Sequence, residues 1–233
     1  MKVVCFDLDD TLYKEIDYLK SAFMEIAEYA VARCACSSDI ANNLSVSSYE
    51  KMLKAYHEGH NAFDELNSFL ETKTPISDFL HIYRHHKPKI LLDRDTTLML
   101  NTLNTENIRI GLITDGRSIQ QRSKIEALGL KRWMADDDII ISEEFGSEKP
   151  CCSNYTYFMK KYPAVHDFYY VGDNITKDFI APNQLGWNTI CLKDDGRNIH
   201  KQNITDIEEG MAPRFMINAL NDIPDMLQSS YPG

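Results

Sequence analysis

The chain has 233 residues, of which 35 are acidic and 25 basic, and its formal net charge is −10. Hydrophobic residues make up 43% of the sequence, which excludes an intrinsically disordered chain and a collagen-like repeat. A chain of this length forms one large domain, or a domain with an insertion, around a sizeable core. The acidic balance argues against general binding to nucleic acids or membrane surfaces, since both favour a basic protein face.

The sequence predicts a soluble cytoplasmic protein. No apolar stretch approaches the ~18 residues of a membrane-spanning helix, and Asp7 comes too early for the apolar core of a signal peptide. Without a signal peptide, the thiols are expected to stay reduced. The cysteines lack the spacing and the histidine partners of a zinc site. We therefore interpret them as structural or incidental: Cys5, Cys34, Cys36, Cys151, Cys152 and Cys191.

Short apolar runs alternate with helical patterns along most of the chain. Each run suits a strand that is buried on both faces, as in a parallel sheet. Strand starts near residues 108, 138 and 168 recur at about the length of one β-α-β unit. We therefore predict an α/β fold, a Rossmann-like parallel-sheet core wrapped by helices. The expected strands are residues 3–6, 108–113, 139–141, 168–171 and 189–192, with a weaker run at 215–217, and the expected helices of this part are 95–103, 118–128, 150–162 and 176–185.

An insertion separates the first predicted strand from the second, because the interval is about 70 residues longer than a crossover needs. Apolar residues at three-to-four spacing predict a helix over residues 13–36. Ser47 and Glu50 have the form of a capping box that would open a helix through residue 56. Two further helices are expected at 62–70 and 76–83. We predict an all-helical domain at residues 15–88, inserted into a core domain made of residues 1–14 and 89–233.

Polar and charged residues collect where the predicted strands end. In an open parallel sheet this edge is where ligands bind. A cluster of carboxylates favours a hard divalent cation such as Mg²⁺. A hydroxyl group, the backbone N–H groups of a strand-to-helix turn and a lysine can together hold the oxygens of a phosphate. The residues of this predicted site are Asp7, Asp9, Thr114, Asp115, Gly116, Lys149, Asp173 and Asp178.

The order and spacing of these residues resemble four motifs of the haloacid dehalogenase superfamily, chiefly its magnesium-dependent phosphatases. Residues 7–11 match its DxDxT motif, and residues 172–178 match its GDxxxxD motif. Thr114 matches the Ser or Thr that follows a hydrophobic strand, and Lys149 matches a lysine that often precedes proline. The matches span most of the chain. The resemblance implies a Rossmann-like core with an inserted helical cap, for which residues 15–88 are the expected segment.

The resemblance also implies a role for each matched residue. Asp7 is expected to be the nucleophile, which forms an aspartyl-phosphate intermediate. Asp9 is expected to protonate the leaving oxygen as a general acid and then to activate water as a base. Thr114 and Lys149 are expected to fix the phosphoryl group. Mg²⁺ is the expected cofactor, held by Asp7, the main-chain carbonyl of Asp9, Asp173 and Asp178.

Two neighbouring residues sharpen this expectation. Dehalogenases of the superfamily displace a halide, which needs no protonation, and they lack an acid two residues after the nucleophile. Asp9 therefore favours a phosphoryl-transfer enzyme. Asp10 stands where many relatives carry glycine, and we interpret it as a turn residue. We expect Mg²⁺-dependent hydrolysis of a small phosphorylated metabolite, with neither a nucleic-acid polymer nor a membrane as partner.

Several alternatives stay open at this point. A phosphomutase of the same family would keep the same core residues, and a catalytically silent member would bind phosphate without turnover. A phospho-receiver domain also places acidic residues at a sheet edge, but its nucleophile lies on a middle strand. A calcium loop fails because Thr11 replaces the acidic residue that such a loop needs. The substrate class (nucleotide, sugar phosphate or pyrophosphate) and the oligomeric state stay open, and the basic segment 81–89 is interpreted as a solvated helix end.

Overall fold

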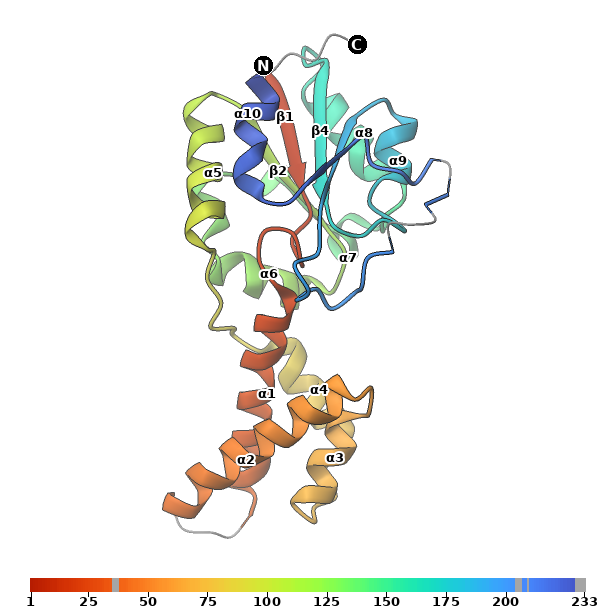
Figure 1. Ribbon diagram of the computed structural model, residues 1–233. Coiled ribbons are helices and arrows are strands. Elements are labelled where there is room, and N and C mark those ends of the chain that lie inside the picture. Colours follow the sequence, from red (N-terminus) through yellow and green to blue (C-terminus); the bar gives the residue numbers. More distant parts are fainter. Residues whose placement is uncertain (35–37, 204–206, 209, 229–233) are drawn as a thin grey trace. The chain divides into compact units, whose positions relative to one another are not determined.

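The computed structural model describes residues 1–34, 38–203, 207–208 and 210–228 (Figure 1). The chain divides into two compact units. The core unit comprises Met1–Ile16 and Leu91–Gly233, and the helical unit comprises Asp17–Ile90. The helical unit thus begins and ends two residues after the predicted segment 15–88. Within the described residues, no helix combines the length and the apolar character that are needed to cross a bilayer.

The core unit is built on a six-stranded sheet with the order β3-β2-β1-β4-β5-β6, and every neighbouring pair is parallel. Strand β1 lies inside the sheet, with Val4 opposite Ile110 of β2 and Tyr169 of β4. Each predicted apolar run forms a strand, so the Rossmann-like parallel sheet is confirmed. The strands are β1 (Lys2–Phe6), β2 (Arg109–Thr114), β3 (Ile139–Ile141), β4 (Asp167–Gly172), β5 (Asn188–Leu192) and β6 (Phe215–Ile217).

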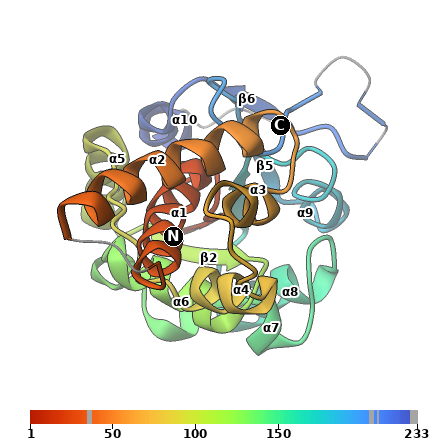
Figure 2. The same cartoon turned by 90° about the horizontal axis from the view of Figure 1, so that it is seen from below.

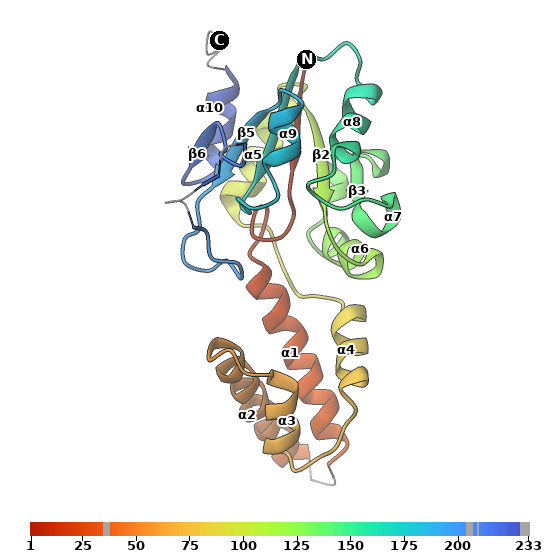
Figure 3. The ribbon, with the colours of Figure 1, turned by 90° about the vertical axis from the view of Figure 1, so that its right-hand side faces the viewer.

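Helices cover both faces of this sheet (Figure 3). On one face, helix α5 packs against the C-terminal helix α10. On the other face, Tyr155 and Phe158 of α8 join strand residues such as Val3 in one buried cluster, which also includes Ala181 of α9. The helices of the core unit are α5 (Arg94–Thr105), α6 (Ser118–Ala127), α7 (Ser142–Phe145), α8 (Cys152–Lys161), α9 (Ile180–Gln184) and α10 (Ile223–Gln228).

The sequence pattern was wrong about the start of α9 and missed two short helices. The helix expected at 176–185 begins only at Ile180, because residues 175–179 form turns and bends. In this segment the Asp178 carboxylate accepts a hydrogen bond of 2.8 Å from the N–H of Asn174. Helices α7 and α10 are too short to show a helical period in the sequence.

The helical unit contains helices α1 (Glu15–Ala32), α2 (Ser38–His57), α3 (Ala62–Phe69) and α4 (Ile76–His85) (Figure 2). No strand occurs among its described residues, as the sequence predicted. The predicted helix over 13–36 ends at Ala32 in the structure, and Cys36 lies outside the described residues. Aromatic rings join these helices, since Phe23 of α1 contacts Tyr56 and Phe63, and Phe63 contacts Phe79.

Two expectations about the helical unit were wrong in detail. Helix α2 begins at Ser38, so the capping-box pattern of Ser47 and Glu50 lies inside the helix. The segment before Ser47 contains neither glycine nor proline, and nothing there stops a helix from starting earlier. In the basic segment 81–89, His85 is exposed as expected, but His86 is buried and bonds to Glu25 and Ser21.

The absence of a side chain at Gly111 allows helix α8 to approach strand β2. A Cβ atom at this position would lie 2.6 Å from Cε1 of Phe158 and 2.9 Å from Sγ of Cys5. Both distances are far below van der Waals contact, so either the ring or the strand would have to move. Gly111 is therefore a packing requirement of this face of the sheet.

We expect Gly111→Ala to lower the free energy of unfolding by roughly 1–3 kcal/mol, the usual cost of overpacking a core. Urea unfolding followed by circular dichroism measures this loss. Phe158→Leu removes the edge of the ring that the new methyl group meets, so the double variant should lose less stability than the sum of the single variants. Strictly additive losses of unfolding free energy would show that the new methyl group at position 111 does not collide with Phe158.

Candidate active site

A polar pocket of about 180 Å³ lies at the carboxyl ends of the strands, and core-unit residues alone form its wall. Acidic side chains dominate the wall. Five of the residues predicted from the strand ends are part of it, together with five others. The lining residues are Asp7, Asp9, Asp10, Glu15, Thr114, Asp115, Asp173, Asn174, Lys177 and His200.

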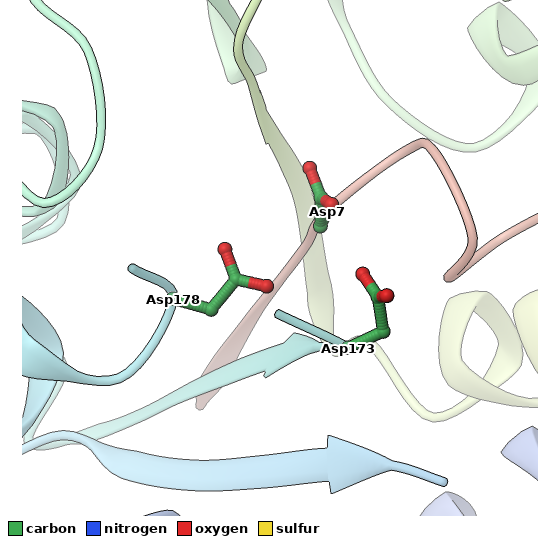
Figure 4. Close-up of side chains that lie close together, drawn as sticks. All are labelled: Asp7, Asp173 and Asp178. Atoms are coloured by element: carbon green, nitrogen blue, oxygen red, sulfur yellow. The ribbon is translucent and has the colours of Figure 1, made fainter. Parts of the chain in front are cut away.

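Three buried carboxylates, those of Asp7, Asp173 and Asp178, converge at this site (Figure 4). One oxygen from each lies within 4.8 Å of one from each of the other two. Asp7 continues strand β1, because its N–H donates to the carbonyl of Val171 in the neighbouring strand β4. Asp173 follows the end of β4, and Asp178 reaches the same place from the turn before α9. A Cβ at Gly172 would lie 2.8 Å from Cγ of Asp178, so only glycine leaves room for this carboxylate.

A single lysine is paired with two of these carboxylates. The Lys149 Nζ atom lies 2.7 Å from Oδ1 of Asp7 and 2.8 Å from Oδ1 of Asp178, and it also donates to the hydroxyl of Tyr170. The Lys149 side chain is almost completely buried. Burial alone would lower the pKa of Lys149, but the charges of Asp178 and Asp7 raise it well above its ordinary value. Lys149 therefore stays charged. It is linked to the pocket by its ion pair with Asp7, which lines the wall.

The Asp173 carboxylate accepts a hydrogen bond but forms no ion pair with any described residue. The side-chain amide of Asn198 donates to its Oδ2 at 2.9 Å. In the described part of the chain, no lysine, arginine or histidine lies within ion-pair distance of it. Burial raises the pKa of Asp173 to about 8, and the charge of Asp7 adds to the effect. Burial likewise raises the pKa of Asp7 to about 7, although Lys149 opposes the shift.

The donor set at this cluster fits a hard divalent cation. All the convergent ligand atoms are carboxylate oxygens, which Mg²⁺ prefers to nitrogen or sulfur. Burial is the main cause of the raised pKa values of Asp7 and Asp173, the charges of neighbouring carboxylates add to it, and Lys149 offsets it only in part. Asp178 has both oxygens engaged by Lys149 and by Asn174, so it is the most strongly held of the three.

The Asp9 carboxylate lies in a different environment from Asp7. Its Oδ1 accepts hydrogen bonds from Tyr13 at 2.5 Å and Lys124 at 2.7 Å, and its Oδ2 accepts one from Gln121 at 2.9 Å. Burial alone would raise the pKa of Asp9, but the Lys124 charge and these hydrogen bonds outweigh burial and lower it. Two aspartates that stand two residues apart thus have pKa values shifted in opposite directions, and the surroundings of Asp9 favour its carboxylate form.

Two of the three residues predicted to bind phosphate after strand β2 line the pocket. Thr114 and Asp115 line the pocket, and the Thr114 hydroxyl accepts a hydrogen bond of 2.7 Å from Gln121. The N–H of Gly116, predicted to bind phosphate, donates instead to the Ser142 hydroxyl at 3.0 Å. Ser142 is the first residue of α7, which begins directly after β3, so its hydroxyl lies beside this turn.

Asp10 is a turn residue, as its position suggested. Its φ angle is +56°, a left-handed conformation that favours glycine over most side chains. Its carboxylate accepts hydrogen bonds from the N–H groups of Glu15 at 2.9 Å and Ile199 at 2.8 Å. Asp10 therefore holds the loop after β1 together and ties it to the segment that follows β5.

The sequence analysis missed Gln121 and Lys124, which lie on the buried face of α6. Together with Ile125 and Leu128, they occupy positions i, i+3, i+4 and i+7 of one helix face, so a polar pair on an apolar stripe was the available signal. It also missed Lys177, a partly exposed cation of the pocket wall whose Nζ lies 3.3 Å from Oδ2 of Asp115. No pattern in the sequence distinguished Lys177 from an ordinary loop lysine.

The comparisons with known proteins agree on one family of hydrolases. The family model described as haloacid dehalogenase-like hydrolase matches residues 4–192. The chain is 30% identical over 241 aligned residues to the glyceraldehyde 3-phosphate phosphatase of Methanocaldococcus jannaschii, with 98% of both chains covered. It is 29% identical over 123 residues to a pyrimidine 5'-nucleotidase of Escherichia coli, which covers 52% of this chain and 50% of that protein.

The fold is also shared with solved structures. A hydrolase of the haloacid dehalogenase type from Bacillus subtilis, crystallised with bound magnesium, superposes with a TM-score of 0.66 at 20% sequence identity. The match covers 97% of this chain and 98% of that one.

The metal-free protein is expected to lose stability as the pH rises from about 4 to about 8. In the folded chain Asp173 keeps its proton up to about pH 8, whereas its ordinary pKa is 3.8. The folded state therefore binds more protons than the unfolded state within this window, and its stability falls as the pH rises.

Urea unfolding in EDTA between pH 5 and pH 8 measures this effect. The stability of the wild type relative to Asp173→Asn should fall by at least ~1 kcal/mol over this range, since one pKa unit corresponds to ~1.4 kcal/mol. Asp167→Asn, at the opposite end of β4, is the matched control and should follow the wild type. Parallel pH profiles for the wild type and Asp173→Asn would contradict the raised pKa of Asp173.

Proposed function

The chain belongs to the haloacid dehalogenase-like hydrolase family and is a phosphatase of a small phosphorylated metabolite, and we propose that it acts with Mg²⁺ through an aspartyl-phosphate at Asp7. The observation that carries this proposal is the cluster of Asp7, Asp173 and Asp178, which brings three buried carboxylates together with a single lysine. A protein that only had to be stable would not gain from such a cluster, because unpaired buried charge is costly.

Asp7 and Asp173 are the proposed carboxylate ligands of Mg²⁺, with the main-chain carbonyl of Asp9. Asp178 supports the site by holding Lys149 and the turn after β4, and it offers its remaining lone pairs to the ion. When bound, Mg²⁺ would neutralise negative charge on the nucleophile and on the phosphoryl oxygens. Asp173, which forms no ion pair with a cation in the described part of the chain, would gain most from the ion.

The proposed reaction proceeds in two displacements at phosphorus. Asp7 attacks the phosphoryl group, and the bond from phosphorus to the leaving oxygen breaks. Asp9, which must carry a proton when the substrate is bound, gives that proton to the leaving oxygen. Water then attacks the phosphorus of the aspartyl-phosphate, Asp9 takes a proton from the water, and the Asp7 carboxylate leaves. Each cycle consumes one water molecule and returns both aspartates to their starting states.

Three groups are proposed to hold the phosphoryl group during these steps. Thr114 supplies a hydroxyl group from the end of β2, and the N–H of Asp115 supplies a backbone donor. Lys149 holds Asp7 in place and stabilises charge on the transferred group. The predicted contribution of the Gly116 N–H would require this group to exchange its hydrogen bond with Ser142 for one to the phosphoryl group.

We propose a short sugar phosphate as the substrate, with glyceraldehyde 3-phosphate as the first compound to test. Glyceraldehyde 3-phosphate is the substrate in the name of the relative from Methanocaldococcus jannaschii, which matches nearly the whole chain. The nucleotidase from Escherichia coli matches only about half of it, so a pyrimidine nucleotide is the weaker candidate.

We expect the protein to release phosphate from glyceraldehyde 3-phosphate and p-nitrophenyl phosphate when Mg²⁺ is present, and to lose this activity in EDTA. Asp7→Asn should lower kcat by at least ~10³-fold, because it removes the nucleophile. Asp167→Asn is the matched control and should retain full activity. Phosphate release is measured with malachite green across a panel that includes nucleotides. Isomerisation of a sugar phosphate without net phosphate release would favour a mutase, and no turnover of any phosphoester would favour a binding role.

The phosphoenzyme can be detected separately in Asp9→Asn. p-Nitrophenolate leaves without a proton, so the first step should survive, whereas hydrolysis of the intermediate needs Asp9 as a base. Rapid mixing with p-nitrophenyl phosphate should therefore release a burst of about one p-nitrophenolate per chain, followed by slow turnover. A linear time course without a burst, together with the absence of a phosphorylated chain in the mass spectrum, would contradict the proposed intermediate.

A further inference from the structure

We propose that Lys124 and Gln121 are positioning residues, which fix the rotation of the Asp9 carboxylate and so determine which of its oxygens meets the leaving oxygen of the substrate. This inference rests on the proposed role of Asp9. Neither residue belongs to the four motifs that the sequence resembles. Both project from helix α6, which begins four residues after the motif residue Thr114 at the end of β2.

The hydrogen bonds to Asp9 are distributed unequally between its two oxygens. Oδ1 accepts from both Tyr13 and Lys124, whereas Gln121 is the one donor to Oδ2 among the residues that the structure describes. A carboxylate oxygen offers about two lone-pair sites, so Oδ1 is fully used and Oδ2 keeps one site. Because Asp9 lines the pocket, the geometry assigns Oδ2 as the oxygen that faces the reacting group.

Gln121 links this orientation to the phosphate-binding loop. Its Nε2 atom lies 2.9 Å from Oδ2 of Asp9, 2.7 Å from the Thr114 hydroxyl and 2.9 Å from the carbonyl of Asp115. A carboxylate and a carbonyl both require a donor, which fixes the orientation of the amide. Gln121 thus ties the loop after β1 to the loop after β2, and holds Asp9 at a set position relative to the proposed phosphoryl site.

Lys124 is the strongest sign that this arrangement serves more than stability. Its side chain is 2% exposed, and its Nζ also lies 3.4 Å from Oε1 of Glu15. Replacing a buried ion pair by well-packed apolar side chains is often neutral or stabilising. A buried lysine that contacts the proposed acid–base residue is therefore better explained by what it does to Asp9 than by what it adds to the core.

Lys161 provides a matched comparison in the same unit. It also pairs with an aspartate, Asp138, at 2.6 Å, and its side chain is 20% exposed. Asp138 directly precedes strand β3, so this ion pair lies at the amino ends of the strands, opposite the pocket. Substitution of Lys161 removes a lysine–aspartate pair from the core unit without touching the proposed site.

The effect of a misplaced Asp9 depends on the leaving group. An alkoxide leaves only when it receives a proton, so the first step on an alkyl phosphate needs a well-placed acid. p-Nitrophenolate needs none. The value of kcat/KM reports the formation of the phosphoenzyme, so the ratio of kcat/KM for glyceraldehyde 3-phosphate to that for p-nitrophenyl phosphate isolates the placement of the acid from general damage to the site.

The experiment measures this ratio for the full-length protein with saturating Mg²⁺. Lys124→Met and Gln121→Leu should each lower the ratio by at least ~10-fold, the lower range for losing an effective general acid. Lys124→Arg should recover part of the loss, because it restores a donor to Oδ1. Lys161→Met should leave the ratio unchanged. Circular dichroism checks that each variant is folded. If one of the two variants does not fold, the ratio of kcat/KM values in the other tests the inference.

Two outcomes overturn the inference in different ways. Equal losses on both substrates in Lys124→Met and Gln121→Leu, with a lowered ratio in Asp9→Asn, would show that the two residues are merely structural while the proposed role of Asp9 stands. An unchanged ratio in Asp9→Asn would reject the acid role of Asp9 itself, and the positioning role with it.

Discussion

Repulsion among buried carboxylates governs the architecture of the candidate site. Asp7, Asp173 and Asp178 bring oxygens within 4.8 Å of one another, and Lys149 is the cation paired with two of them. The arrangement persists because the sheet holds it: Asp7 is bonded to the neighbouring strand, and Asp178 is fixed by the turn after β4. The raised pKa values of Asp7 and Asp173 follow first from burial and then from this repulsion, which Lys149 offsets only in part, and a bound divalent cation would lower both.

Asp7 and Asp9 have different surroundings because different elements of the core unit face them. Asp7 shares Lys149 with Asp178, whereas Asp9 shares Lys124 with Glu15 and has two further donors in Tyr13 and Gln121. The proposed roles of Asp7 as a nucleophile beside a bound cation and of Asp9 as a rigidly held acid–base group both rest on this division. Helix α6, which follows β2, is therefore as much a part of the site as the strand ends.

The sequence predicted the sheet and the strand-end residues because both leave local signals. Apolar runs mark β1 to β6, and polar residues at their ends mark Asp7, Asp9, Thr114 and Asp173. Contacts between distant segments leave weaker signals. Nothing local shows that α7 captures the N–H of Gly116, or that Lys124 is buried against Asp9. The capping-box pattern at Ser47 failed for the opposite reason, because a short local motif can also occur inside a longer helix.

Calorimetric titration of the metal-free protein with Mg²⁺ at neutral pH tests the central claim most directly. The account predicts saturable binding of about one ion per chain with release of protons, seen as an enthalpy that varies with the buffer, because the raised pKa values keep the carboxyl groups partly protonated. Asp173→Asn should bind at least ~10-fold more weakly, a loss of ~1.4 kcal/mol or more, and Asp167→Asn should bind like the wild type. Binding of equal strength in Asp173→Asn, or no saturable binding to the wild type, would contradict the account.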